Sequence, residues 1–241
     1  MITPTALSPE LPGRLADALR SGRFAVTAEI APPRGADLVP VRRAAEHLRG
    51  WVDAVNVTDN AGANVRMSSL AGSLALLEEG VDPVMQMTCR DRNRIALQSD
   101  LLSASALGVP NLVLMTGDRP EQGDHPDAAA VFDLDSGGLM SAARTLRDDA
   151  TLMSGRAVDP APRYLLGAVD SPGPSADRFA QKVDGGAQFV QTQFVFDIAT
   201  FRGSLGQVRD RGLDTRCGVL AGAGPIRALR ALEVVASIPG E

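Results

Sequence analysis

Glu29, Asp118 and Gln193 are the residues of this sequence whose types and positions best suit chemistry. Each follows or ends a short apolar run: Glu29 in TAEIAPPR, Asp118 in LMTGDRP and Gln193 in FVQTQF. A carboxylic acid in a partly desolvated site has a raised pKa and can donate a proton, whereas an amide can orient a ligand. We therefore expect a site that protonates and orients its ligand beside a redox cofactor.

Other kinds of chemistry have few candidate residues. The two histidines and two cysteines lack metal-ligand or disulfide spacing, and Lys182 is the only lysine. A histidine-based catalytic triad, a structural zinc site, a histidine-rich metal cluster and a phosphate loop that uses lysine are therefore not expected.

Two further motifs each have two interpretations. The GAG turn at 222–224, before Pro225 at a predicted helix start, either brings backbone N–H groups to a phosphate or is an ordinary turn. Asp133 and Asp135 either hold a cation, or Asp135 or Ser136 caps the helix that follows.

Short apolar runs alternate with helical patterns along the chain, which is typical of βαβ units and a parallel sheet. The predicted strands lie near residues 24–29, 53–58, 84–88, 111–116, 164–169, 188–194 and 217–221. The predicted helices lie near 9–20, 38–49, 67–79, 92–107, 136–149, 175–185, 199–211 and 225–236. This α/β pattern favours one domain over residues 1–241, a TIM-type (β/α)8 barrel that lacks the last βα unit. Three explanations fit a count of seven units instead of eight. The barrel closes in an unusual way, the chain is a fragment, or a partner supplies the last unit.

The elements of such a barrel would bring the polar residues together. Side chains alternate along a strand, so Gln86 shares a face with Thr88, and Gln191 shares one with Gln193. A barrel gathers the carboxyl ends of its strands into one mouth, and the long irregular stretch at 119–135 would open on the same side. We expect these groups to face one ligand.

The composition limits the class of protein. The chain has 241 residues, of which 44% are hydrophobic, and a formal net charge of −5. An acidic chain is not expected to bind nucleic acid or anionic membranes in bulk. The sequence also shows no membrane-spanning apolar run and no signal-peptide pattern at its start, so a cytoplasmic protein is expected.

The sequence resembles the methylenetetrahydrofolate reductase family in six blocks that occur in the same order. These blocks are TAEIAPPR (27–34), NVTDNAGAN (56–64), MTCRDRNRIALQSDLL (87–102), LMTGDRP (114–120), FDLDSGGL (132–139) and QKVDGGAQFVQTQFVFD (181–197). The resemblance implies a (β/α)8 barrel. It also implies reduction of 5,10-methylenetetrahydrofolate to 5-methyltetrahydrofolate with hydride from NADH or NADPH, through a bound flavin that is commonly FAD.

The resemblance assigns roles to single residues. Glu29 matches the general acid that helps to open the five-membered ring of the substrate to an iminium. Asp118 matches the carboxylate near flavin and pterin, and Gln193 matches the amide that meets pterin and nicotinamide in turn. Thr58 and Lys182 match positions that contact flavin. The predicted cofactor-binding set is Thr58, Gln86, Thr116, Gly117, Asp118 and Lys182.

Three departures from the family pattern leave the cofactor open. Gln86 replaces a histidine of well-known flavoenzymes of the family, Thr116 replaces an arginine before Gly-Asp, and Gln181 replaces an arginine before Lys182. Without these cations, the sequence is compatible with three alternatives. The chain binds FAD through other contacts, it binds FMN instead, or hydride passes directly from NADH without a flavin.

The expected partner is a small folate substrate, in one-carbon metabolism and methionine biosynthesis, and the expected assembly is a homo-oligomer or a complex with a partner subunit. The alternatives are a non-catalytic, subunit-like barrel that binds folate or flavin, and a flavin oxidoreductase with another substrate.

Overall fold

Seven parallel strands form the centre of the structure, a computed structural model that describes residues 7, 8, 10–171, 173 and 175–224. The strands are β1 (Thr27–Ile30), β2 (Ala54–Val57), β3 (Pro83–Thr88), β4 (Asn111–Met115), β5 (Leu165–Asp170), β6 (Phe189–Phe194) and β7 (Gly218–Gly222). They pair in sequence order from β1 to β7. The predicted strands are thus confirmed, with bounds that shift by only a few residues.

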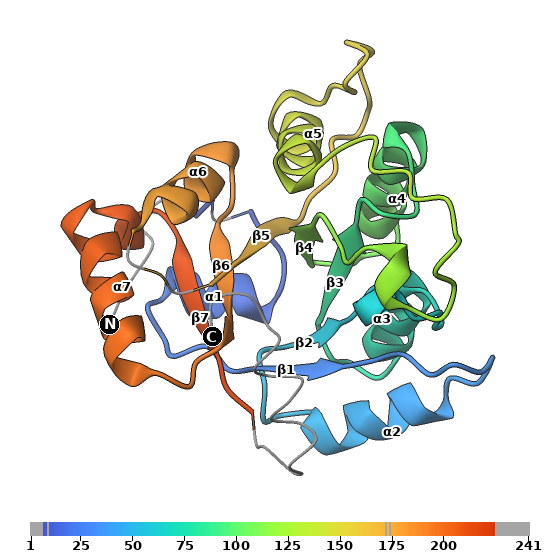
Figure 1. Cartoon of the computed structure of the whole chain (residues 1–241), viewed down its shortest axis with the longest axis horizontal. Helices are drawn as coiled ribbons and strands as arrows, with labels where there is room; N and C mark the ends of the chain where they lie inside the picture. The colour runs from blue at the N-terminus through green and yellow to red at the C-terminus, as the bar shows by residue number, and fades with distance from the viewer. Residues whose placement is uncertain (1–6, 9, 172, 174, 225–241) are drawn as a thin grey trace.

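All but the first of the described helices connect the strands and cover the outer face of the curled sheet, whereas the first precedes β1 (Figure 1). The helices are α1 (Arg14–Arg20), α2 (Val39–Leu48), α3 (Ser69–Glu78), α4 (Arg94–Ala106), α5 (Ser136–Asp149), α6 (Asp177–Gly185) and α7 (Ile198–Asp210), with 3₁₀ turns η1 (Ala61–Ala63), η2 (Pro120–Gln122) and η3 (Leu213–Thr215). The seven-stranded (β/α) barrel without an eighth unit is therefore confirmed for these residues. The predicted helix at 225–236 lies outside them.

The first helix starts later than predicted. It begins at Arg14 rather than near residue 9, because Pro12 and then Gly13, with a φ of +96°, precede it. Among the described residues, no helix is both long enough and apolar enough to span a membrane.

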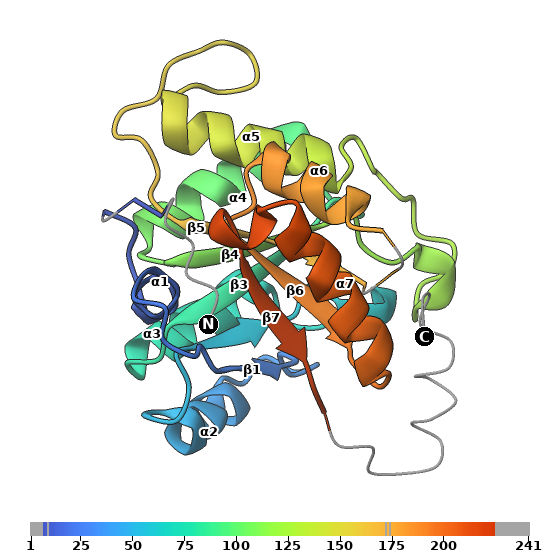
Figure 2. The same ribbon diagram turned by 90° about the vertical axis from the view of Figure 1, so that its left-hand side faces the viewer.

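An apolar layer closes the end of the barrel where the strands begin. There, one inward-facing residue from each of β2 to β7 joins Leu15 and Leu19 of α1 in a single apolar cluster. Figure 2 shows α1 near the ends from which the strands start. These strand residues are Ala54, Val84, Val113, Leu165, Phe189 and Leu220. The contact is close, since a Cβ added to Gly218 of β7 would lie 2.8 Å from Leu19 Cδ2. α1 therefore acts as the bottom of the barrel.

The intervening strand residues pack outward against the helices. A large cluster lies under α4, α5 and α6, and a smaller one lies under α2 and α3. The two outer clusters fill the outer face of the sheet, and the layer against α1 fills the inner face near the start of the strands. Polar side chains on the inner face therefore lie toward the carboxyl ends of the strands.

Replacing Leu15 with Ala should lower the free energy of unfolding by about 3 kcal/mol, because the side chain is fully buried and its loss leaves a cavity against the strands. Leu107→Ala is the matched control, since Leu107 is 48% exposed and should cost less than about 1 kcal/mol. Urea denaturation measures both. Equal losses would contradict the role given to α1.

Candidate active site

Glu29 and Gln86 meet at the carboxyl ends of the strands, the side of a (β/α) barrel where active sites lie. Glu29 belongs to β1 and Gln86 to β3, and Gln86 Nε2 donates a hydrogen bond to Glu29 Oε2 at 3.0 Å. The two residues come from strands that are not neighbours, because β2 lies between β1 and β3 in the sheet. Of the predicted site residues, these two are therefore in direct contact.

The surroundings of Glu29 favour its protonated form. Its side chain is exposed to solvent, yet the neighbouring strands displace much of the water around the carboxyl group. This burial raises the pKa of Glu29 above its ordinary value, and the hydrogen bond from Gln86 opposes the rise with a smaller effect. Glu29 is therefore suited to hold a proton and to donate it.

A second polar contact crosses the lumen one layer above the apolar bottom. Gln191 Nε2 of β6 donates to Asn56 Oδ1 of β2 at 2.7 Å, and Asn56 Nδ2 donates to the Ala28 carbonyl at 3.2 Å. Asn56 is only 4% exposed and is the register partner of Glu29 on β1. Sequence analysis placed Gln191 on the same face as Gln193 but missed Asn56, whose amide interrupts the apolar strand AVNV.

A partly buried ion pair holds the loops that follow β2 and β3. Asp59 accepts hydrogen bonds from Thr88 N at 2.8 Å and Thr88 Oγ1 at 3.0 Å, and it pairs with Arg92, which also bonds Asp100. Sequence analysis missed Asp59, although it directly follows a buried strand as Asp118 does. The cluster fixes the position of the β3 end that carries Gln86 and Thr88.

Asp118 lies exposed after β4 and leans toward the loop after β2. Its Oδ2 accepts a hydrogen bond from Gly62 N at 2.8 Å. The same two loops meet again further along. Asp124 accepts a hydrogen bond from Val65 N at 3.1 Å, and Gly123 lies directly against the Ala63 carbonyl. Asp118 therefore joins two loops at the mouth, and the structure shows no direct contact between it and Glu29 among the described residues.

The rest of the 119–135 segment is anchored by carboxylates. Asp133 forms an ion pair with Arg94 at 2.8 Å, and Asp135 accepts from Gly138 N at 2.7 Å. The interpretation of Asp135 as the cap of α5 is thus confirmed.

The predicted cofactor-binding residues differ in their surroundings. Thr58 is buried after β2, and its Oγ1 has no hydrogen-bond partner among the described residues. Thr116 is exposed after β4, and its Oγ1 accepts from Ser136 N at 3.2 Å. Gly117 has a φ of +94°, and a Cβ there would lie 2.8 Å from Thr88 Cβ, so only glycine lets the ends of β3 and β4 come this close.

The predicted alternation along β6 stops at a bulge. Gln191 pairs with Leu220 but Phe194 pairs with Gly222, so β6 has one residue more than β7 between these pairs. Gln193 lies within this irregularity, where a period of two no longer fixes the face of a side chain. Its place on the same face as Gln191 therefore does not follow from the alternation.

Lys182 lies away from the groups described so far. It is in the last turn of α6, a helix that starts after β5 and runs back toward the beginning of β6. The structure brings no other predicted site residue into contact with it among the described residues.

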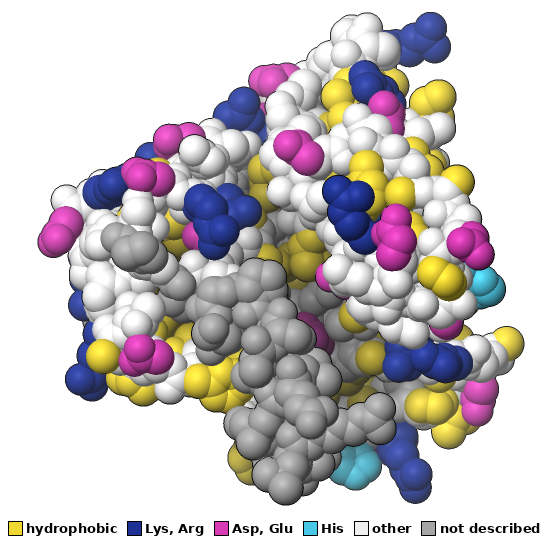
Figure 3. Space-filling model, viewed as in Figure 1, with side chains coloured by type: hydrophobic (Ala, Val, Ile, Leu, Met, Phe, Trp, Pro, Cys, Tyr) yellow, Lys and Arg dark blue, Asp and Glu magenta, His cyan; other side chains and the backbone are white. Residues whose placement is uncertain are grey.

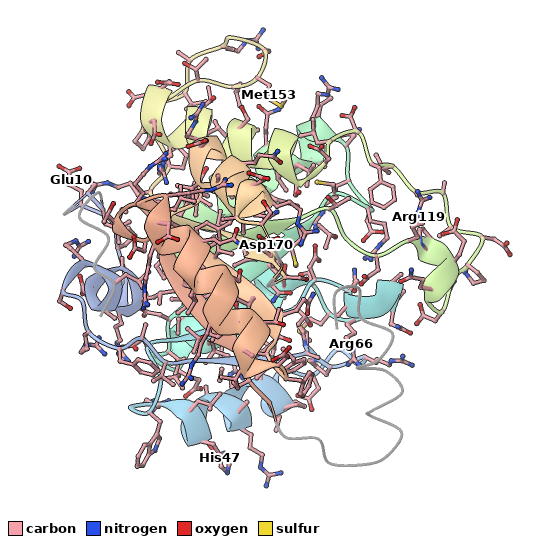
Figure 4. All side chains as sticks on the ribbon, turned by 60° about the vertical axis from the view of Figure 1, so that its left-hand side comes forward. Glu10, His47, Arg66, Arg119, Met153 and Asp170 are labelled. Atoms are coloured by element: carbon pink, nitrogen blue, oxygen red, sulfur yellow. The ribbon has the colours of Figure 1, made fainter. Side chains whose placement is uncertain are left out.

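Arginines surround the mouth on the loops after β1, β2 and β4. Arg34 Nη2 donates to Asn64 Oδ1 at 3.3 Å, and Arg66 Nη1 donates to the Pro32 carbonyl at 3.0 Å. Arg119 extends from the neighbouring loop on the same side of the molecule as Arg66 (Figure 4). Elsewhere on the face seen in Figure 3, basic and acidic side chains are interspersed.

Two pockets lie outside the lumen. One is lined by outward-facing residues of β6 and by α7, and the other lies between η1 and η2 and is lined by Arg90 and His125 among others. Neither is lined by Glu29, Gln86 or Gln191, so the polar lumen remains the candidate site.

The sequence profile of one family, methylenetetrahydrofolate reductase, matches residues 14–240. The chain belongs to the methylenetetrahydrofolate reductase family. The resemblance inferred from the six sequence blocks is therefore confirmed. These blocks contain Glu29, Asp118 and Gln193.

Two curated relatives carry the name of the family's enzyme. A protein of Caenorhabditis elegans named "Probable methylenetetrahydrofolate reductase (NADPH)" is 27% identical over 221 residues, which cover 87% of this chain and 32% of that protein. The "5,10-methylenetetrahydrofolate reductase" of Pectobacterium carotovorum subsp. carotovorum is 24% identical over 228 residues, which cover 90% of this chain and 69% of that one. The chain thus spans about a third of the length of the first relative.

Solved structures share the fold of this methylenetetrahydrofolate reductase family member. A Clostridium thermocellum protein, described as binding two copies of 5-methyl-5,6,7,8-tetrahydrofolic acid, has a TM-score of 0.64 at 13% identity and covers 92% of this chain and 73% of its own. Tryptophan synthase of Mycobacterium tuberculosis has a TM-score of 0.55 at 16% identity, with coverage of 91% and 82%. At these identities the likeness concerns the fold.

Replacing Gln86 with Leu should raise the pKa of Glu29, because the substitution removes an N–H that stabilises the carboxylate. Carbon-detected NMR titration of the Glu29 carboxyl measures the change. Gln98→Leu is the matched control, since Gln98 lies half-buried on α4 and its hydrogen bonds are with the Arg94 carbonyl and Met153 N rather than with Glu29. A pKa that does not move, or one that falls, would contradict the role given to Gln86.

The raised pKa of Glu29 also predicts how the free energy of unfolding changes with pH. Since the pKa of Glu29 in the folded state is above its unfolded value, the folded state is favoured while the carboxyl is protonated. This contribution is lost as the pH rises through the folded pKa. The free energy of unfolding of Glu29→Gln minus that of the wild type should therefore be larger at pH 8 than at pH 4. Urea denaturation at both pH values measures this difference, and the opposite order would show that the pKa of Glu29 is lowered.

Proposed function

We propose that this chain reduces 5,10-methylenetetrahydrofolate to 5-methyltetrahydrofolate with hydride from NADH or NADPH. The observation that carries the proposal is the Glu29–Gln86 pair at the strand ends of a chain of this family. The names of the two curated relatives and the folate described for the Clostridium thermocellum protein support the same substrate class.

Glu29 would supply the proton that the substrate needs. Opening the five-membered ring breaks one bond between carbon and nitrogen, and the departing nitrogen takes a proton as the methylene carbon becomes an iminium. Burial raises the pKa of Glu29, so the carboxyl group keeps its proton to a higher pH than an exposed glutamate and can pass it to such a nitrogen. Gln86 would hold the carboxyl group in place, and hydride addition to the iminium carbon would complete the methyl group.

The mouth fits a flat, uncharged heterocycle with an anionic arm. The Thr58 hydroxyl without a partner, together with the amides of Gln86 and Gln191, offers neutral hydrogen-bonding groups, while the cations lie outside on the rim. Arg34, Arg66 and Arg119 would bind the glutamate of a folate or the phosphates of a cofactor. NAD(P)H, directly or through a flavin, supplies the hydride when it is bound.

Asp118 and Gln193 are the proposed partners of Glu29. Asp118 is held at the mouth by Gly62 N and would place a negative charge beside the ring that becomes cationic. Gln193, in the bulge of β6, would orient the pterin and the nicotinamide. The flavin contact proposed for Lys182 requires a ligand that extends to α6.

Glu29→Gln should lower the turnover of methylenetetrahydrofolate by about 10² to 10⁴, because the amide cannot donate the required proton to the leaving nitrogen. Cofactor binding should be nearly unchanged, since the charge-neutral replacement keeps the shape of the side chain. Steady-state kinetics measures the first effect and cofactor titration the second. An unchanged turnover would show that another group is the acid.

The absorption spectrum of the purified protein should separate the cofactor alternatives. Flavin bands that bleach with NADH or NADPH and return with methylenetetrahydrofolate are the expected result if a flavin relays the hydride. A colourless protein that oxidises the nicotinamide only when folate is present would indicate direct transfer. Absence of turnover with every donor would contradict the proposed function and favour a barrel that only binds its ligand.

A further inference from the structure

The amide pair that crosses the lumen is built differently from the rest of the barrel interior. Residues two positions earlier on the same strands, Ala54 and Phe189, belong to the apolar layer against α1. Asn56 and Gln191 follow them and bond to each other at 2.7 Å. Interiors of (β/α) barrels are filled mainly by bulky aliphatic side chains, so a pair of amides here needs a reason.

The two amides differ in how many hydrogen-bonding groups remain free. Asn56 is 4% exposed, and it uses its oxygen for Gln191 and one N–H for the Ala28 carbonyl. Gln191 is partly exposed and uses only one N–H, so its second N–H and its Oε1 have no partner among the described residues. Asn56 therefore fixes an amide that still has one donor and one acceptor to offer.

The sheet neighbours of Gln191 on the inner face are apolar, so among the described residues a polar ligand would approach its free groups from the mouth. Its register partner Leu220 and the preceding inward residue Phe189 are both part of the apolar layer. Glu29, the register partner of Asn56, lies on the strand next to this pair. A ligand that approaches the Glu29 carboxyl group therefore comes within the region that the Gln191 amide faces.

We propose that Gln191 is a ligand-binding residue that recognises a lactam edge, an N–H beside a C=O in a flat ring, and that Asn56 is its positioning residue. An amide presents a donor and an acceptor side by side and can make two hydrogen bonds to such an edge. Both the pterin of a folate and the isoalloxazine of a flavin carry one. The inference rests on the proposed function and names a further contact of the same site.

A purely structural role makes a different prediction. If the pair only joins β2 to β6, replacing both amides by apolar side chains of similar size should leave ligand binding unchanged. Removal of both partners together also avoids a buried polar group without a partner, which is the costly case. The double variant Asn56→Leu with Gln191→Met therefore separates folding from recognition.

The test titrates the wild type, Gln191→Met, Asn56→Leu and the double variant with 5-methyltetrahydrofolate and, separately, with FMN. Gln98→Met, on the outer helix α4, is the matched control. Gln191→Met should weaken binding of at least one ligand by about tenfold or more, the effect of one lost hydrogen bond. The double variant should bind no more weakly than Gln191→Met, because Asn56 acts through Gln191. Its thermal unfolding should recover toward that of the wild type.

The two titrations identify the source of the lactam edge. A loss confined to 5-methyltetrahydrofolate assigns the contact to the pterin, and a loss confined to FMN assigns it to the isoalloxazine. Wild-type affinity of Gln191→Met for both ligands would overturn the inference and leave the proposed function standing. If the wild type binds neither ligand, the inference and the proposed function are both wrong.

Discussion

The hydrogen bond between Asn56 and Gln191 requires a curved sheet. β2 and β6 are separated by four strand spacings, or about 19 Å in a flat sheet at about 4.8 Å per spacing. Two short side chains cannot span that distance, yet the amide groups lie 2.7 Å apart. The curl that brings them together also turns the ends of the strands toward one another. The contact of Glu29 with Gln86 and the separation of an apolar bottom from a polar mouth both depend on this curvature.

Loops convert the curvature into a defined mouth. Asp59 ties the loop after β2 to the end of β3, and Asp118 ties the loop after β4 back to η1. Carboxylates that bind backbone N–H groups fix distances that apolar packing leaves loose, because hydrogen bonds are directional. The polar residues at the mouth thus combine two tasks, since Asp118 holds a loop and also remains exposed to a ligand.

Periodicity alone was enough to predict the strands and their parallel arrangement, because short apolar runs that alternate with helical patterns are typical of βαβ units. It could not predict the Asn56–Gln191 contact, which depends on curvature rather than on local pattern. One extra residue in β6 interrupts the alternation expected for Gln191 and Gln193, so the pattern no longer fixes the face of Gln193. Lys182 was assigned through the family resemblance, and the structure places it in the last turn of α6, apart from the mouth.

The separation of the bonded amides along the chain has a consequence for the order of assembly. Each strand pairs with its neighbour in sequence, so the sheet can grow by one short loop closure after another. Asn56 and Gln191 are 135 positions apart, and their bond can form only once β2 to β6 are in place. The polar layer of the interior therefore closes late in folding, and a nascent chain can complete it only after β6 has been synthesised.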